Sequence, residues 1–199
     1  LGNRGWSYED VLPFFRKAQN RQKGANEFHG IGGPLSVSPP RSPNPLNDTF
    51  IQAGVECQIP RNDDFNGATQ EGIGFYELTQ DNGRRCSTAH AYLTPAKNRE
   101  NLTIFKRSIA EKVMIENGRA IAVRAKIDGR AQIIRANKEV ILSCGAFQSP
   151  QLLLLSGIGP KSKLEEHKID QVLELPGVGE NLTDHLDYSL IYESDSEYC

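Results

Sequence analysis

The chain has 199 residues and a formal net charge of −2, with 38% hydrophobic and 24% charged residues. These ordinary values predict a globular protein of one domain, or of one domain with an appendage. They exclude nucleic acid as an expected partner, because phosphate binding needs clustered Lys and Arg in excess, and no apolar run approaches the ~20 residues of a membrane span.

Local capping signals predict helices near the N-terminus. Ser7 and Asp10 have the spacing of a capping box, which favours a helix over residues 8–19, and Pro13 is expected to shorten or kink it. An Asn-Pro pair then predicts a second helix over residues 44–57, because Asn is a good cap and Pro suits the first helical position.

A polar loop, a strand and a helix are predicted next along the chain. The segment "NDDFNGATQEG" (62–72) is polar, "IGFYELTQ" (73–80) is rich in β-formers, and "NGRRCSTAHAYL" (82–93) predicts a turn into a helix. Arg84 and Arg85 would begin that helix, where their charge opposes its dipole. A salt bridge to an acidic side chain is favoured over an anion site for this pair.

Short β-rich runs fill the segment from Asn101 to Cys144. They are separated by Asn-Gly at 117–118 and Asp-Gly at 128–129, both strong hairpin signals. The sequence therefore predicts a β-meander. The apolar run at 139–143 lacks alternation, which is typical of a central parallel strand covered on both faces.

A glycine turn follows, in "GAFQSPQLLLLSGIGP" (145–160). Gly145 and Ala146 leave the backbone open to close approach, Ser149 is expected to cap a helix over 151–156, and Gly157 to end it. A strand, a glycine turn and a helix N-terminus commonly receive a nucleotide phosphate. Close packing of helix on strand without a ligand explains the pattern equally well.

Several blocks of sequence resemble the glucose-methanol-choline (GMC) oxidoreductases, flavoenzymes that oxidise alcohols, in the order and spacing of that family. The blocks cover nearly the whole chain and are most similar to bacterial choline dehydrogenases and related alcohol dehydrogenases. They are "GNRGWSYEDVLPFFRKAQN", "FHGIGGPL", "DDFNGATQEGIGFYELTQDNGRRCSTAHAYLTPAKNRENLTI", "KEVILSCGAFQSPQLLLLSGIGP" and "LPGVGENLTDHL".

The resemblance implies an α+β or α/β fold: a partial, Rossmann-like FAD-binding domain with a β-meander, plus part of a substrate-binding domain. Residues 1–100 would contribute to the substrate side and the cover of FAD. Residues 101–185 would form part of the FAD-binding domain, and residues 186–199 would begin the substrate-binding domain. The chain begins with Leu and lacks the family's opening G-x-G-x-x-G turn, so an internal fragment is expected.

FAD is the cofactor that the resemblance implies. The position of Ala110 corresponds to an adenine contact, the Gly145 turn to backbone near the flavin, and "ENLTDH" to a stretch on the flavin side. The predicted cofactor-binding residues are Ala110, Gly145, Ala146, Ser149, Asn181, Asp184 and His185.

No catalytic or metal-binding residue is assigned. The family's catalytic His region has no match in this sequence, and the cysteines lack zinc-type spacing. Structural roles are therefore favoured for the prominent side chains. His29 is expected to fix its loop by a hydrogen bond, with a position facing the active site as the alternative, while His90 is expected to be buried and His167 solvated. A solvated turn is favoured over paired acid/base or metal-binding carboxylates for Asp63 and Asp64, and core packing over a substrate pocket for the aromatic residues Phe75, Tyr76 and Tyr92.

The implied function is FAD-dependent oxidation of an alcohol or choline-type substrate to the aldehyde, by hydride transfer to flavin in the full-length parent. A small-molecule alcohol is the expected partner, with oxygen and a quinone-type acceptor both open. A cytoplasmic location is expected, with peripheral membrane association as the alternative.

The competing hypothesis is a non-catalytic flavin- or nucleotide-binding module. A nicotinamide enzyme would need a fingerprint that the sequence lacks. The isolated fragment is expected to be inactive, to expose apolar surface and to self-associate.

Overall fold

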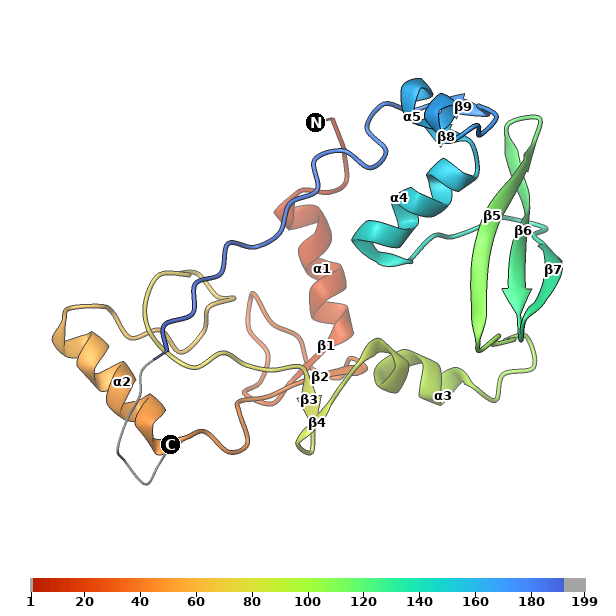
Figure 1. Cartoon of the computed structure of the whole chain (residues 1–199). Coiled ribbons are helices and arrows are strands. Elements are labelled where there is room, and N and C mark those ends of the chain that lie inside the picture. Colours follow the sequence, from red (N-terminus) through yellow and green to blue (C-terminus); the bar gives the residue numbers. More distant parts are fainter. Residues whose placement is uncertain (1, 192–199) are drawn as a thin grey trace. The chain divides into compact units, whose positions relative to one another are not determined.

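The computed structural model describes residues 2–191 of the chain (Figure 1). These residues form two compact units, one ending at Leu102 and the other running over Thr103–Ile191. The first unit is rich in loops and helices, and the second is built on a three-stranded sheet. The mixture of helices and strands confirms the predicted α/β class.

Both predicted helices of the first unit are present. Helix α1 (Tyr8–Ala18) begins with a complete capping box, in which the Ser7 hydroxyl accepts from the Asp10 N–H and the Asp10 carboxylate accepts from the Ser7 N–H, both at 3.2 Å. Pro13 lies inside α1 without ending it. Helix α2 (Pro45–Glu56) begins after Asn44, whose Oδ1 accepts from the Leu46 N–H at 2.9 Å.

The strands of the first unit are short pairs. Strand β1 (Gln19–Arg21) leads directly out of α1 and pairs in parallel with β2 (Leu35–Val37). Strands β3 (Gln80–Asp81) and β4 (Arg84–Arg85) form a small antiparallel hairpin. A bridge between Ser38 and Leu78 joins the two pairs of strands.

The segment 73–93 differs from the prediction. Residues 73–80 form no continuous strand, since only Ile73 and Leu78 make isolated bridges before β3 begins. The arginine pair lies in β4 and not at a helix start, because the left-handed backbone at Asn82 and the glycine after it closes a hairpin first. The helical part is the short π-helix η1 (Ala89–Leu93), followed by α3 (Thr94–Ala96).

The meander of the second unit confirms the prediction. Strands β5 (Ser108–Glu116), β6 (Arg119–Ile127) and β7 (Arg130–Arg135) are antiparallel in that order, and the turns between them lie at 117–118 and 128–129. Strand β5 begins later than the β-rich run at 102–109 suggested.

Helix α4 (Gly145–Leu155) packs against β5, and a buried hydroxyl joins the two. The Ser156 Oγ accepts from the Val113 N–H at 2.8 Å and donates to the Leu152 carbonyl at 2.6 Å. Since β5 pairs only with β6 in the described part of the chain, this bond satisfies a buried N–H on the other edge of the strand. The remaining elements are β8 (Ile158–Gly159), α5 (Lys161–Glu166) and β9 (Leu173–Glu174), with β8 and β9 parallel.

The predicted buried strand at 139–143 is wrong for this structure. The run is irregular, pairs with no strand among residues 2–191, and leaves Ile141 76% exposed. A central parallel strand needs a neighbour on each side, and the meander strands pair with one another instead. Helix α4 also starts at Gly145, ahead of the predicted start at 151, so Ser149 lies within the helix.

Large apolar side chains are exposed in both units, as expected. The most exposed include Trp6, Phe14, Ile141, Phe147 and Ile191. Among the described residues, no helix has both the length and the apolar character needed to cross a membrane.

Candidate functional site

The predicted cofactor turn lies at the N-terminus of α4. Gly145 has φ +86°, a left-handed conformation that strains any residue with a side chain, and the space where a Cβ would stand is open. The first N–H groups of a helix lack partners within it and carry the positive end of its dipole. This end of α4 therefore offers hydrogen-bond donors on an uncovered backbone.

Side chains within α4 shape its first turn. The Ser149 hydroxyl accepts from the Cys144 N–H at 3.0 Å, so it fixes the residue that precedes the turn. Pro150 has no N–H to donate to the Ala146 carbonyl, four residues earlier. The Ser149 hydroxyl thus fixes the first turn, while the Ala146 carbonyl and the first N–H groups of the helix stay available to a ligand.

A cavity of about 440 Å³ lies beside this turn and brings two of the predicted residues together. Ala146 and Asn181 both line it, although they are far apart in the sequence. Asn181 has φ +55°, and this left-handed residue sits in the irregular segment that faces α4. The full lining is Ala146, Phe147, Pro150, Gln151, Leu154, Gly179, Glu180, Asn181, Leu182 and Thr183.

The other five predicted residues do not line this cavity, although Gly145 and Ser149 lie in the first turns of the same helix. Asp184 and His185 follow it along the chain, both exposed, and the Asp184 Oδ1 accepts the His185 backbone N–H at 2.7 Å. Ala110 is exposed on β5, opposite Ala125. The cofactor-binding roles of all seven residues stay predictions.

Sequence reasoning missed the apolar and polar walls of the cavity. Phe147, Gln151 and Leu154 follow one another at helical i, i+4 and i+7 spacing, a signal that they share one face of α4. Leu182 and Thr183 carry no comparable signal, because they belong to an irregular segment.

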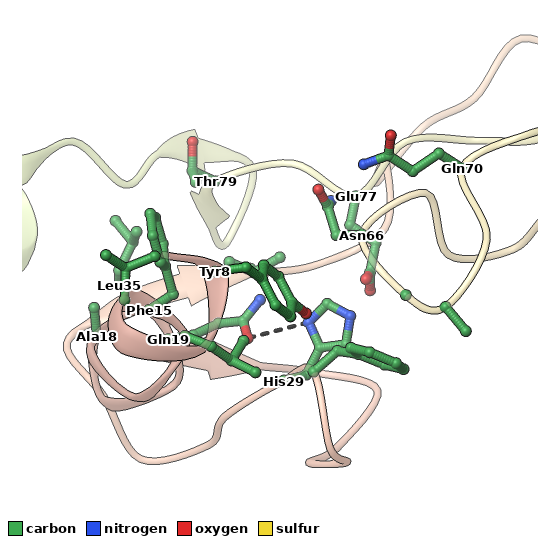
Figure 2. Close-up of a pocket in the computed structure, with 16 residues that line it drawn as sticks. Tyr8, Phe15, Ala18, Gln19, His29, Leu35, Asn66, Gln70, Glu77 and Thr79 are labelled. Carbon is green, nitrogen blue, oxygen red and sulfur yellow. Dashed lines mark hydrogen bonds between the residues drawn. The ribbon is translucent and has the colours of Figure 1, made fainter. Parts of the chain in front are cut away.

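A second cavity, of about 940 Å³, lies in the first unit (Figure 2). His29 lines it, buried, with Nδ1 3.2 Å from the Gln19 Oε1 and Nε2 2.9 Å from the Asp64 Oδ2. The loop-fixing role predicted for His29 is confirmed. Asp64 is no solvated turn residue, because it also pairs with Arg21 at 3.1 Å. Its neighbour Asp63 is exposed and pairs with Arg61.

The remaining expectations have mixed outcomes. His90 is exposed, with its Nε2 3.6 Å from the Asp81 Oδ2, so the predicted burial is wrong. His167 is exposed, as expected. Neither arginine of β4 forms an ion pair within residues 2–191. Tyr76 and Tyr92 are exposed and not core residues. The described residues contain no cluster of three or more His, Cys, Asp or Glu side chains that could hold a metal ion.

The sequence and fold of this chain are similar to those of known proteins. The family model of the GMC oxidoreductases matches residues 1–187, so the chain belongs to that family of oxidoreductases. The matches indicate FAD as the cofactor.

Two curated relatives and one solved structure illustrate the similarity. The oxygen-dependent choline dehydrogenase of Sinorhizobium fredii is 45% identical over 94% of this chain and 34% of its own length. The enzyme of that name from Pseudomonas fluorescens is 48% identical over 96% of this chain and 34% of its own. The crystal structure of pyridoxine 4-oxidase from Mesorbium loti has a TM-score of 0.79 at 31% identity, covering 88% of this chain and 35% of that one. The chain thus spans about a third of the curated relatives' length.

The α4 site fits part of such a cofactor. Its free helix N–H groups, the uncovered backbone at Gly145 and the Asn181 amide suit a polar, electron-rich group, and Phe147 offers an aromatic wall. A cavity of about 440 Å³ suits one portion of a dinucleotide and not the whole molecule.

Proposed function

We propose that this chain is part of an FAD-dependent oxidoreductase that converts a CH–OH group, in an alcohol or choline-type substrate, to the aldehyde. The observation that carries the proposal is the family match over residues 1–187. The open helix N-terminus beside Asn181 supports it, because this element suits a polar cofactor group. The relatives named choline dehydrogenase favour a choline-type alcohol.

In this proposal, α4 holds and orients the cofactor. The N–H groups of its first turn hydrogen-bond a polar edge, Gly145 admits that edge to the backbone, and Asn181 contributes an amide from the facing segment. FAD, when bound, supplies the hydride acceptor for oxidation of the carbinol carbon. Residues 1–100 are proposed to contribute to the substrate side and the cover of FAD, and residues 101–185 to form part of the FAD-binding domain. Residues 192–199 of the predicted 186–199 segment lie outside the described residues. No residue of this chain is assigned to removal of the hydroxyl proton.

The electron acceptor and the location belong to the same proposal. We favour oxygen over a quinone-type acceptor, because the relatives are named oxygen-dependent. Oxygen uptake that follows alcohol turnover by a longer form of the protein would test this choice. A cytoplasmic location is supported by the thiols of Cys57, Cys86 and Cys144, which form no disulfide within residues 2–191. Recovery of the protein in a membrane pellet would favour peripheral association instead.

Titration with FAD tests the proposed function. The chain of 199 residues and a longer form that contains it are titrated in parallel while flavin fluorescence is followed. We expect the longer form to bind FAD, and Gly145→Val to weaken that binding more than Gly177→Val, since Gly177 has open space and no left-handed backbone.

The titration separates the oxidoreductase from a non-catalytic module that does not bind flavin, while oxygen uptake during alcohol turnover separates it from one that does. Binding by the longer form alone keeps the oxidoreductase and assigns this chain an incomplete site. Absence of binding by both, with intact folding by circular dichroism, favours a non-catalytic module.

A further inference from the structure

The cavity of about 940 Å³ in the first unit is lined by both polar and aromatic side chains. Figure 2 shows His29 with Asn66, Gln70 and Glu77 on one side and residues of α1 on the other. Tyr8, Phe15 and Phe28 supply the aromatic rings. This cavity is built entirely within residues 8–79, so it shares no lining residue with the site at α4.

One carboxylate oxygen of Glu77 lacks a hydrogen-bond partner among the described residues. The Arg21 Nε donates to its Oε2 at 2.7 Å, and the two side chains are only 6% (Arg21) and 7% (Glu77) exposed. The other oxygen, Oε1, is buried and has no hydrogen-bond partner within the described residues. Since a buried acceptor left without a donor is costly, this oxygen favours a ligand that donates to it.

The nearest cation does not satisfy that oxygen. The Lys23 Nζ lies 3.9 Å from Oε1, too far for a hydrogen bond, and donates instead to the Asp63 carbonyl at 3.2 Å. Lys23 therefore neutralises part of the charge without filling the hydrogen-bonding position.

The other carboxylate of this cluster, that of Asp64, is 26% exposed and already has its donors. Asp64 receives the Arg21 Nη2 at 3.1 Å and the His29 Nε2 at 2.9 Å, and its Oδ1 also accepts the Asn66 N–H at 3.2 Å. Of the two acidic side chains in this cluster, Glu77 alone keeps an oxygen for a donor from outside.

We propose that this cavity binds a primary ammonium group carried on an apolar or aromatic body. The ammonium donates to the Glu77 Oε1 in a charge-assisted hydrogen bond, while the rings of Tyr8, Phe15 and Phe28 contact the body and favour the positive charge. A single water would satisfy Oε1, but a cavity of about 940 Å³ leaves room for a much larger occupant. The inference does not rest on the proposed function, because it involves neither flavin nor alcohol oxidation.

Calorimetric titration of the whole chain with matched probes tests this site. The probes are 2-phenylethylamine, its trimethylammonium analogue and 2-phenylethanol, which share one body but differ in charge and in N–H donors. We expect the primary amine to bind at least about tenfold more tightly than either of the others, the effect of one charge-assisted hydrogen bond. Equal binding of the trimethylammonium compound or the alcohol would overturn the proposal, as would no binding of the amine, the result if the cavity holds water only.

Variants locate the binding. Glu77→Gln is expected to remove the tenfold preference, whereas Glu71→Gln, the same charge change at an exposed glutamate near the cavity, is expected to keep it. Equal loss in both variants would indicate a general charge effect and contradict the site.

A second variant keeps the test decisive if Glu77→Gln does not fold. Ala68→Trp places a ring at an exposed position of the cavity lining and leaves Arg21 and Glu77 unchanged. We expect this variant to retain its circular dichroism spectrum and to lose amine binding. Unchanged amine binding by a folded Ala68→Trp would place the ligand elsewhere.

Discussion

Two apolar, β-rich regions of the second unit differ in whether they form a sheet. Strands β5, β6 and β7 pair through tight hairpins, whereas the run at 139–143 forms no strand and leaves Ile141 exposed. Their composition alone does not separate them. The hairpin strands find partners a few residues away, while a parallel strand needs partners brought from distant parts of a chain. Pairing, and not apolar content, decides which run becomes ordered sheet.

The largest effect is expected at Gly157, which follows α4, the helix that packs against the meander. Gly157 has φ +85°, and a Cβ there would overlap the Asp170 carbonyl oxygen. Gly157→Ala therefore combines backbone strain with a clash, and we expect it to lower the free energy of unfolding by about 3 kcal/mol. Urea denaturation of the variant beside Gly177→Ala measures this, and equal midpoints would contradict the account.

The hydroxyl that joins α4 to the meander should have the next largest effect. Ser156→Ala leaves the buried Val113 N–H without an acceptor, which is expected to cost about 1–3 kcal/mol of unfolding free energy. The same change at exposed Ser162 is the control. A loss below that range would show that water or another group reaches Val113.

A hairpin turn gives a smaller effect. Gly118 has φ +75° with open space around it, so Gly118→Ala introduces strain without a clash. We expect a loss of about 1 kcal/mol, seen as a shift in the urea midpoint. An unchanged midpoint would indicate that pairing of the meander does not depend on this turn.

The smallest effect is expected at the unpaired run. Ile141→Thr alters a side chain that is 76% exposed, so the free energy of unfolding should change by less than about 0.5 kcal/mol. The same change at buried Ile127 is expected to cost about 1–3 kcal/mol, because it places a hydroxyl in the core. A large effect at Ile141 in the chain of 199 residues would show that the run is packed after all.

The candidate site was only partly accessible from the sequence. Family blocks located the Gly145 turn and the Asn181 segment, and the cavity beside α4 brings Ala146 and Asn181 together. The start of α4 was misplaced, because a proline typical of a first helical turn lies further inside this helix. The Arg21–Glu77 ion pair joins residues 56 positions apart, so no local sequence pattern predicts it.

What the sequence determined by itself is local. The capping box of α1, the Asn-Pro start of α2 and the turns at 117–118 and 128–129 are settled by groups within a few residues of one another, so their signals survive in the sequence. Tertiary structure alone decided the hairpin at Arg84–Arg85, the irregular run at 139–143 and the unpartnered oxygen of Glu77. Burial and partnership depend on segments that meet only after folding, and a linear pattern does not record which segments meet.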